Sequence, residues 1–385
     1  MPLTIFAILV LVIWLGMWLG NGFFWRIDRE PVPQAPAEWP DVIAVIPARN
    51  EEALIGETVA SLFDQGYPGG FRIVVVDDHS EDATAEEAER AAEVRNRSGD
   101  LRVVAAEPLP EGWAGKVWAM DQGIERGIPP GFDGYVLLCD ADIHHGRDSL
   151  RELVCRAEAN QLDLASVMVR LRCESVAETL LIPAFVFFFR MLYPFRRVNN
   201  PADRTAGAAG GTMLVRMSAL ERIGGLASIR GELIDDCSLA RQIKRGGRRI
   251  WLGLSDSSYS TRGYGSTGEI VRMIARTAYT QLGRSPIRLI GCIFGLAVTF
   301  VAPVVLLFAF GWPSLIGAAA WLLMALLYLP MVRFYRQSPL WSLLLPAAAC
   351  VYLWATLVSA WNHHRGRGGQ WKGRAQTASL SPSDR

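Results

Sequence analysis

Three long apolar blocks follow one another near the C-terminal end of the chain, and they constrain its fold more than any other feature. They occupy Ile287–Phe310, Trp312–Val332 and Leu340–Trp361. A helix needs about 20 apolar residues to cross a bilayer, and the core of a water-soluble domain has no use for three such blocks in succession. The segment 287–362 is therefore predicted to form about three transmembrane helices.

A fourth apolar stretch lies at the other end of the chain. Thr4–Trp25 contains no charged residue and is long enough to cross a bilayer. It lacks the basic start of a signal peptide and exceeds the apolar core of one, and Arg26 and Arg29 follow it. Residues 1–25 are therefore predicted to form an uncleaved transmembrane anchor.

Lysines and arginines near the membrane segments indicate the orientation, because positively charged loops stay on the cytoplasmic side. Arg26 and Arg288 flank residues 26–286, so this part is predicted to lie in the cytoplasm. The protein is then a multi-pass protein of the inner (cytoplasmic) membrane. Three spans would place the basic polar tail, residues 363–385, outside the cytoplasm. This placement opposes the tendency of basic segments to stay inside, so the sequence does not decide on which side the tail lies.

Within residues 26–286, short apolar runs alternate with segments of helical spacing. Strands are predicted in the runs "DVIAVI", "FRIVVVDD", "LRVVAAE" and "YVLLCDAD", the first of them stopped by Pro47. Helices are predicted between them, for example from Glu51 onward and over Lys116–Arg126. Continuous apolar strands alternating with helices indicate an α/β fold with a Rossmann-like, mostly parallel sheet.

In such a sheet, ligands bind outside the carboxyl ends of the strands. The candidate ligand-binding residues are those at the ends of the first, second and fourth strands: Pro47, Arg49, Glu51, Asp77, Asp78, Asp140 and Asp142. No G-x-G-x-x-G follows the first strand, and no G-x-x-x-x-G-K-[ST] loop occurs. A dinucleotide-binding or P-loop function is therefore not expected.

Asp140 and Asp142 are separated by one residue, so their side chains would point the same way if the strand continued. Carboxylates at a strand end suit Mg²⁺ or Mn²⁺, which bind through one or two such groups plus phosphate oxygens of a substrate. A turn or a helix cap would also explain an isolated Asp-x-Asp, but the acid pair at another strand end favours the metal. His144 and His145 could supplement the carboxylates or pack in a loop, and both interpretations stay open.

Three further positions carry candidate groups. Lys116 lies at a Gly-flanked helix start, where its ammonium and the helix N-terminus both favour phosphate, although a solvated lysine is an equal alternative. Asp235 and Asp236 precede a helical run and either cap that helix or supply the general base of a sugar transfer. Arg276 could meet a diphosphate or lie at the membrane interface.

Two other segments have unusual composition. Residues 180–197 are apolar and aromatic but interrupted by Pro183 and Pro194, so an interfacial helix beside the bilayer is predicted, with a buried core helix as the alternative. The Gly-rich segment Thr205–Leu220 would let the backbone approach a bulky ligand closely, although a plain loop would explain it as well.

Charge and cysteine content limit the remaining classes. The net charge is only +1, so nucleic acid is not an expected partner. The six cysteines show no paired spacing, and two of them lie in apolar membrane blocks. Reduced thiols are therefore expected in place of a disulfide framework.

The motifs taken together resemble the inverting, GT-A-fold glycosyltransferases of family 2. The resemblance covers about Val42–Gln281 and rests on "VIPARNEE", "VVVDDHSEDAT", "GWAGKVWAM", "CDADI", "GGTMLVRMSALERIGG" and "DDCSLARQI", in this order. It implies a GT-A domain over residues 26–286 that takes a nucleotide-sugar donor and Mg²⁺ or Mn²⁺.

The resemblance also implies roles for individual residues. Asp78, with Asp77 beside it, would bind the nucleotide base, Asp140 and Asp142 would hold metal and diphosphate, and Asp236 would be the general base. Pro47, Arg49, Glu51 and Lys116 join the predicted donor site. Two departures are present: Asp235 replaces the family's glutamate, and the Gln-x-x-Arg-Trp signature of processive members is absent. The missing signature argues against processive synthesis. Arg276 lies in the segment that takes its place and is the counterpart of its arginine.

The membrane layout, with "WAGKVWAMDQG" and "ARTAYTQLGRSP", is most similar to hopene-associated glycosyltransferases of bacteria, and more distantly to ceramide glucosyltransferases. This similarity implies a lipid acceptor. The expected function is transfer of a sugar, with inversion, from a UDP-sugar to a hopanoid-like or other lipid hydroxyl. The alternatives are a polyprenyl-phosphate sugar transferase, a polysaccharide synthase-like enzyme, and a non-enzymatic membrane scaffold, against which the retained acids argue.

Overall fold

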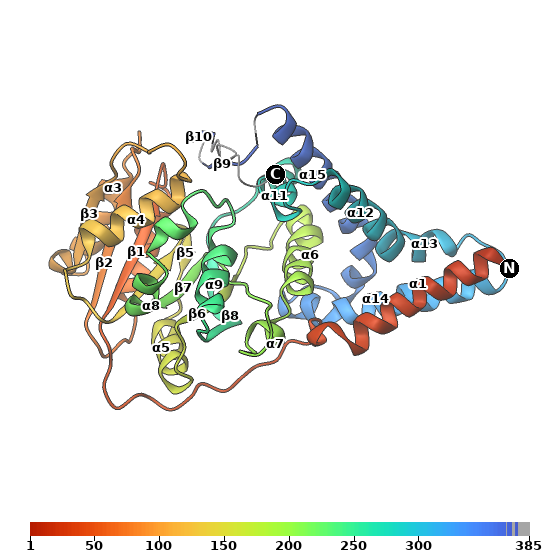
Figure 1. Cartoon of the computed structure of the whole chain (residues 1–385), viewed down its shortest axis with the longest axis horizontal. Helices are drawn as coiled ribbons and strands as arrows, with labels where there is room; N and C mark the ends of the chain where they lie inside the picture. Colours follow the sequence, from red (N-terminus) through yellow and green to blue (C-terminus); the bar gives the residue numbers. More distant parts are fainter. Residues whose placement is uncertain (367, 372–373, 376–385) are drawn as a thin grey trace. The chain divides into compact units, whose positions relative to one another are not determined.

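The computed structural model describes residues 1–366, 368–371 and 374–375 of the chain (Figure 1). The chain forms two compact units. The α/β unit comprises Glu30–Arg172, Arg197–Arg262 and the described part of Gly369–Arg385, and the apolar helical unit comprises Met1–Arg29, Cys173–Arg196 and Gly263–Gly368. Of the tail predicted at 363–385, residues 367, 372–373 and 376–385 lie outside the described residues.

The α/β unit is built on an eight-stranded mixed sheet with the order β3-β2-β1-β4-β7-β6-β8-β5 (Figure 1). Its strands are β1 (Val42–Ala48), β2 (Phe71–Asp77), β3 (Leu101–Ala105), β4 (Tyr135–Cys139), β5 (Ile143–His144), β6 (Leu164–Arg170), β7 (Thr212–Arg216) and β8 (Ile250–Ser260). Strands β1 to β4 are mutually parallel, as are β6 and β8. In contrast, β7 is antiparallel to β4 and β6, and β5 is antiparallel to β8. The predicted α/β fold is confirmed, and β7 is its main departure from parallel order.

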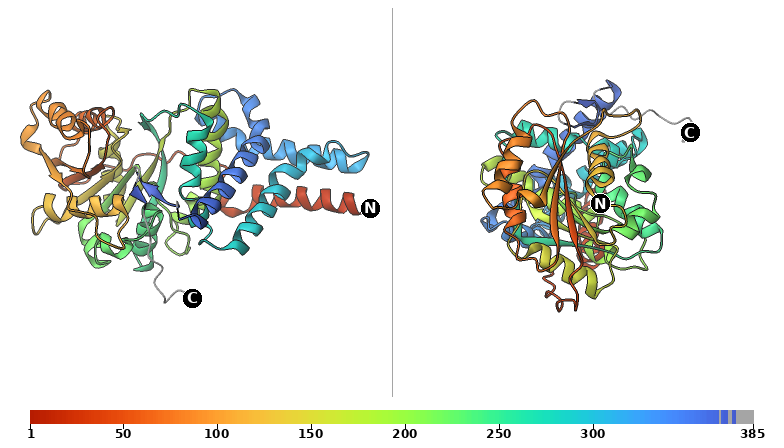
Figure 2. Two further views of the ribbon diagram at one scale, coloured as in Figure 1. Left: turned by 90° about the horizontal axis from the view of Figure 1, so that it is seen from above. Right: turned by 90° about the vertical axis from the view of Figure 1, so that its left-hand side faces the viewer.

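Helices cover both faces of this sheet, as the right-hand view of Figure 2 shows. On one face, α2 (Ile55–Phe63), α3 (Thr84–Glu93) and α5 (Ser149–Ala159) share a buried core with Val42, Ala44 and Ile46 of β1. On the other face lies α4 (Gly115–Gly127), where a Cβ at Gly123 would meet Val45 and Val76 at about 2.5 Å. The α/β unit also contains α8 (Met217–Arg222) and α9 (Asp235–Arg245), and α7 (Phe195–Val198) crosses the boundary between the units in the chain. A short pair, β9 (Gln370–Trp371) and β10 (Arg374–Ala375), follows near the C-terminus.

Strand β1 continues through Pro47, where the sequence predicted a stop. Pro47 is opposite Val76 of β2, whereas the pairing of β1 with β4 ends at Val45 and Leu138. Proline lacks an N–H group, so it is tolerated in a strand where no neighbour needs that donor. The strand therefore ends two residues later than predicted, at Ala48.

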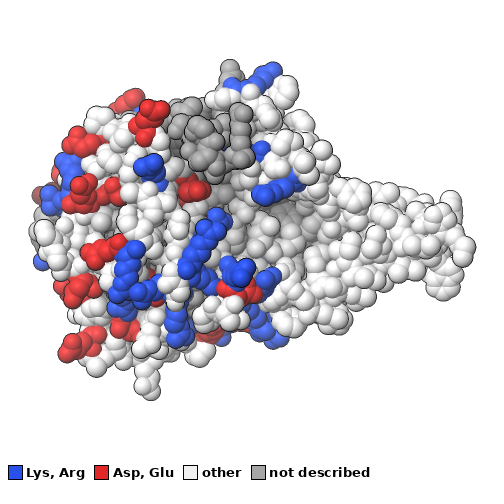
Figure 3. Space-filling view, viewed as in Figure 1, with Lys and Arg blue, Asp and Glu red and all other residues white. Residues whose placement is uncertain are grey.

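The apolar helical unit contains eight complete α-helices among the described residues: α1 (Pro2–Leu19), α6 (Val176–Leu192), α10 (Thr267–Ala275), α11 (Ala278–Gln281), α12 (Pro286–Leu296), α13 (Ala302–Leu306), α14 (Trp312–Phe334) and α15 (Leu345–His364). Five stretches of the described chain are long and apolar enough to cross a membrane, by length and composition alone: Pro2–Leu19, Val176–Val198, Pro286–Leu306, Trp312–Phe334 and Pro339–His364. On the face in Figure 3, the end of this unit at the N-terminus carries no charged side chain. Four of the stretches correspond to the predicted spans.

The fifth stretch contains the segment 180–197, which was predicted to be interfacial. Its helix α6 begins earlier than expected, because the side chain of Ser175 accepts a hydrogen bond from the N–H of Glu178 in a capping box. The helix continues through Pro183, so it is longer than its prolines suggest. Its interfacial position stays a prediction.

The two units divide the predicted domain 26–286 differently from the sequence interpretation. Cys173–Arg196 belongs to the apolar helical unit, where the hydroxyl of Tyr352 in α15 donates to the carbonyl of Leu181 at 3.0 Å. The residues from Gly263 onward also belong to this unit, since α10 packs along α15. Apolar surface on these segments is buried by the apolar helices, so they fold with them.

Candidate active site

Lys116 is the centre of the first cluster of charges in the α/β unit. It is the second residue of α4, and its Nζ atom lies 2.7 Å from Oδ1 of Asp140 and 3.4 Å from Oδ2 of Asp235. Burial by itself lowers the pKa of this lysine, but the two carboxylates outweigh burial and hold its pKa above the ordinary value. Lys116 is therefore a permanent cation that joins the end of β4 to the start of α9.

Asp236 lies beside this lysine and is held by two backbone groups. The N–H of Gly210 donates to Oδ2 at 2.9 Å, and the N–H of Cys237 donates to Oδ1 at 2.7 Å. Burial and the neighbouring Asp235 raise the pKa of Asp236 to about 6, although Lys116 opposes them. A carboxylate with a pKa near neutrality is suited to accept a proton.

The neighbouring glycine explains how the Gly-rich segment reaches this carboxylate. A Cβ at Gly210 would lie 3.2 Å from Nζ of Lys116 and 3.4 Å from Oδ2 of Asp236. Since β7 is antiparallel to β4, its first residue is opposite Cys139, at the carboxyl end of β4. The segment before β7 is therefore brought to the acids, and its close approach to a ligand stays a prediction.

Asp142 belongs to a second cluster. Strand β4 ends at Cys139, so Asp140 and Asp142 are in a turn before β5 and have different partners, contrary to the expectation for a continuing strand. Nε of Arg262 lies 2.6 Å from Oδ2 of Asp142, and Nη2 lies 2.6 and 2.7 Å from the two carboxylate oxygens of Glu51. Burial and Asp140 raise the pKa of Asp142, against the effect of Arg262.

The ends of β1 and β2 hold the third group of predicted residues. Nη1 of Arg49 donates to the carbonyl oxygens of Asp78 and His79, at 2.5 and 3.2 Å. Asp78 is buried, and its Oδ1 lies 3.2 Å from Nδ1 of His79. Oδ1 of Asp77 accepts the N–H of Ser80 at 3.0 Å. Arg49, Asp77 and Asp78 thus share one loop region, and their role in base binding stays a prediction.

Of the two histidines after the Asp-x-Asp turn, one has side-chain partners and the other is buried. Nδ1 of His144 lies 3.1 Å from a carboxylate oxygen of Glu57, and its ring stacks on Tyr259 with centroids 4.7 Å apart. His145 is buried, and burial lowers its pKa to about 3. These contacts favour the packing interpretation over metal ligation.

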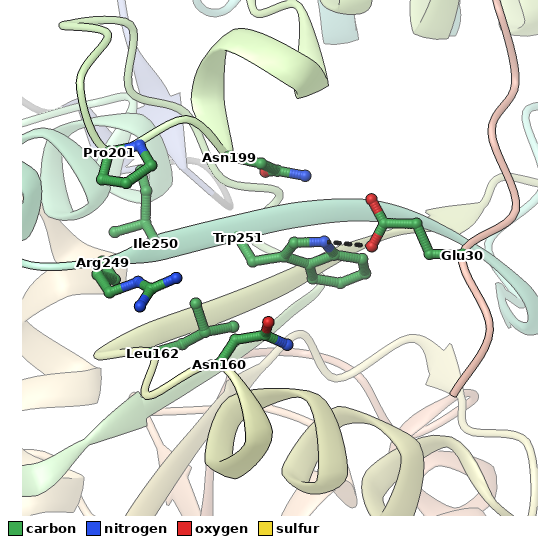
Figure 4. Close-up of a pocket in the computed structure, with 8 residues that line it drawn as sticks. All are labelled: Glu30, Asn160, Leu162, Asn199, Pro201, Arg249, Ile250 and Trp251. Atoms are coloured by element: carbon green, nitrogen blue, oxygen red, sulfur yellow. Dashed lines mark hydrogen bonds between the residues drawn. The ribbon is translucent and has the colours of Figure 1, made fainter. Parts of the chain in front are cut away.

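A small cavity of about 200 Å³ lies at the amino ends of β6 and β8 (Figure 4). Arg262 follows the opposite end of β8. The indole N–H of Trp251 donates to Glu30 across it at 3.1 Å, and the guanidinium of Arg156 stacks over the same indole at 4.4 Å. Glu30 is already paired with Arg156, and none of the predicted site residues lines this cavity.

The acids at the other end of the sheet outnumber the bases that contact them. In the described residues, the two clusters join five carboxylates to two cations, Lys116 and Arg262: Asp140, Asp142, Asp235, Asp236 and Glu51. The surplus of negative charge suits a divalent cation. No three acidic, histidine or cysteine side chains of the described chain stand close enough to hold a metal by themselves. The donor set therefore fits Mg²⁺ or Mn²⁺ shared between one or two carboxylates and substrate phosphates.

Comparison with known proteins shows which proteins share this fold. Residues 43–224 match the family model "Glycosyl transferase family 2". The structure is similar to mannosyltransferase PcManGT from Pyrobaculum calidifontis, solved in complex with GDP-Man and Mn²⁺, with 20% identity, a TM-score of 0.55, and coverage of 93% of this chain and 99% of that chain. No match was found among curated proteins.

Two further solved structures are less similar. S. aureus TarS is 18% identical with a TM-score of 0.40, covering 62% of this chain and 40% of that one. Glucosyl-3-phosphoglycerate synthase from Mycobacterium tuberculosis, in complex with Mn²⁺, UDP-glucose and glycerol 3-phosphate, is 17% identical with a TM-score of 0.40, covering 64% and 80%.

The mixed, curled sheet with its helices is the GT-A fold, as predicted. The protein is a glycosyltransferase. More particularly, residues 43–224, just under half of the chain, are similar to glycosyltransferase family 2.

Arg262 is a site residue that was not predicted from the sequence, whereas Arg276 was predicted and its role is untested by the fold. Arg262 follows β8, whose second half, "SDSSYS", is too polar to be recognised as a buried strand. The strand-end rule would have identified Arg262 if β8 had been predicted. Arg276 ends α10 in the apolar helical unit, so its role stays a prediction.

Proposed function

We propose that the protein transfers a sugar, with inversion, from a nucleotide-sugar donor to a lipid hydroxyl. The observation that carries the proposal is the meeting of Lys116, Asp140, Asp235 and Asp236 at the carboxyl end of β4 within a family 2 domain. A cation and a buried carboxylate of raised pKa at one place supply the two groups that a displacement of diphosphate requires.

Asp236 is the general base in this proposal. It takes the proton of the acceptor hydroxyl while the hydroxyl oxygen forms its bond to the anomeric carbon. The bond from that carbon to the diphosphate oxygen breaks in the same displacement, so the anomeric centre inverts. The electron pair of the broken bond stays on the diphosphate, where Lys116 provides positive charge. The hydrogen bonds from Gly210 and Cys237 fix the carboxylate of Asp236 but leave lone pairs on both oxygens.

Asp140 and Asp142 are the residues that would hold Mg²⁺ or Mn²⁺, together with phosphate oxygens of the donor. The bound ion supplies neutralisation of the charge that develops on the leaving diphosphate. Arg49, Asp77 and Asp78, grouped at the ends of β1 and β2, are proposed to bind the nucleotide base, with Pro47 and Glu51 nearby in the sequence. A UDP-sugar is the first donor to test, and a GDP-sugar, as bound by PcManGT, is the second.

The lipid acceptor is supported by the five apolar stretches that share the chain with the catalytic domain. Such stretches would hold the catalytic domain at a bilayer, where a lipid acceptor is available. We propose a multi-pass protein of the inner membrane with its catalytic domain in the cytoplasm, where nucleotide sugars are made. A hopanoid-like lipid is the acceptor to test first, and the interfacial or spanning segment 180–197 and Arg276 are proposed to lie near that acceptor or the diphosphate.

The test is transfer of radiolabel by membranes that contain the full chain, with a panel of labelled UDP- and GDP-sugars, followed by lipid extraction. We expect label in the lipid fraction, its loss on adding EDTA, and recovery on adding Mn²⁺ or Mg²⁺. Label that appears only in water-soluble or polymeric product would contradict a lipid acceptor. If the labelled lipid is a polyprenyl phosphate and Asp236→Asn remains active, the alternative polyprenyl-phosphate transferase is correct, since a phosphate acceptor needs no strong base.

A further inference from the structure

Arg262 makes charged contacts to both acids of the second cluster at once. Its Nε contacts Oδ2 of Asp142 at 2.6 Å, and its Nη2 contacts both carboxylate oxygens of Glu51. Glu51 is 7% exposed, and the side chain of Asp142 is 13% exposed. Two largely buried carboxylates without a cation would repel each other, so this guanidinium neutralises both.

The backbone on either side holds this arrangement in place. The N–H and hydroxyl of Thr261 both donate to the carbonyl oxygen of Asp142, at 2.8 and 3.1 Å. Ile143 pairs with Ser260 where β5 meets β8. The segment that carries Arg262 is therefore fastened to the segment that carries Asp142, and the ion pair is part of the fold of this turn.

A guanidinium has only donor groups and cannot share a metal's coordination shell. Nε of Arg262 lies 2.6 Å from Oδ2 of Asp142, so a divalent cation on the same carboxylate would bring two positive charges together. Their repulsion favours displacement of the guanidinium from Asp142. The contacts of Nη2 with Glu51 do not involve Asp142, so the displaced guanidinium would remain tethered next to the site.

We propose that Arg262 is a tethered counter-cation of the metal site: it holds Asp142 and Glu51 before the donor arrives, and a divalent cation binds Asp142 by displacing it. The proposal rests on the proposed function, because it takes Asp142 as a metal ligand. Its consequence is that metal alone binds weakly, whereas metal brought with a nucleoside diphosphate binds well. Arg262 is thus a positioning residue that links metal loading to donor loading.

The test is Mn²⁺ binding to the purified full chain, measured from the electron paramagnetic resonance signal of free Mn²⁺, with and without UDP. Arg262→Ala should bind Mn²⁺ alone about tenfold more tightly than the wild type, a coupling of ordinary size. Arg262→Lys keeps the charge and should stay close to the wild type. Arg248→Ala is the matched control, because Arg248 precedes the other end of β8 and lies 3.9 Å from Asp163 in an ion pair of its own.

A second variant keeps the test valid if Arg262→Ala misfolds. Arg262→Gln keeps hydrogen-bond donors for Asp142 and Glu51 but no charge, and it should also raise the affinity for Mn²⁺ alone. Unchanged or weaker Mn²⁺ binding in both variants overturns the counter-cation role. If UDP-loaded wild type binds Mn²⁺ and Asp142→Asn abolishes this, the metal site of the proposed function stands regardless. If no Mn²⁺ binds to any form with UDP, the metal site and the counter-cation role both fail.

Discussion

The two ends of strand β4 use charge in opposite ways. At its amino end, the hydroxyl of Tyr135 donates to Glu158 at 2.6 Å and accepts a hydrogen bond from Arg216, which also pairs with Glu158 at 2.9 Å. At its carboxyl end, Asp140 and Asp142 join separate clusters in which acids exceed bases. The amino end is balanced within the protein, whereas the carboxyl end has surplus negative charge.

This difference indicates where binding energy is available. A balanced cluster of one acid and one base stabilises the fold but has no capacity left for a ligand. A cluster with surplus carboxylates is unfavourable by itself and is relieved when a cation and its diphosphate arrive. Substitutions at the carboxyl end of β4 can therefore be compared with substitutions at its amino end.

The largest effect is expected at Asp236. Asp236→Asn removes the proton acceptor and should lower the rate of sugar transfer by about 10³-fold, within the range for general-base catalysis. Glu158→Gln, at the amino end of β4, should transfer sugar at nearly the wild-type rate. The measurement is incorporation of labelled sugar into lipid, and a rate for Asp236→Asn within about twofold of the wild type would contradict the base assignment.

Lys116 should have the next largest effect. Lys116→Met leaves Asp140 and Asp235 without the cation that joins them, and it removes positive charge from the proposed diphosphate position. We expect kcat/KM for the donor to fall by about 10²-fold. Lys116→Arg keeps the charge and should recover part of the loss. Equal activity of the Met and Arg variants would show that charge at this position is unimportant.

The pH dependence follows from the raised pKa of Asp236. Its pKa is about 6, against an ordinary 3.8, so kcat/KM should be constant above pH 7 and fall as the pH drops through about 6. The free energy of unfolding depends on pH in the opposite direction, because burial favours the protonated carboxyl of Asp236. The stabilising effect of that form is complete below pH 3.8 and is lost as the pH rises through about 6. Asp236→Asn should therefore unfold at a higher temperature than the wild type at pH 8, but not at pH 4, and equal differences at both would contradict the raised pKa.

The smallest effect is expected at the amino end. Tyr135→Phe removes one hydroxyl from a cluster in which Glu158 and Arg216 still pair. We expect a loss of about 1 kcal/mol in the free energy of unfolding and no change in sugar transfer. Thermal unfolding in detergent and the labelling assay measure the two quantities. A large loss of transfer would mean that the two ends of β4 are coupled and do not act independently.

Much of the fold and part of the site could be predicted from the sequence. Continuous apolar runs predicted β1 to β4, because strands in a buried parallel sheet need apolar side chains on both faces. The family motifs then gave Lys116, Asp140 and Asp236. The partners of these residues could not be predicted, since the contact of Lys116 with Asp235 joins positions far apart in the chain.

The sequence by itself determined that apolar helices flank an α/β domain and that acids follow its strands, because hydrophobic pattern and strand-end residues are local properties. Only the tertiary structure decided that β7 runs antiparallel and brings Gly210 to Asp236, and that Arg262 arrives at Asp142 from the end of β8. Strand order and direction depend on packing of the whole sheet. The packing of the sheet therefore pairs Asp140 with Lys116 and Asp142 with Arg262, although only one residue separates the two aspartates.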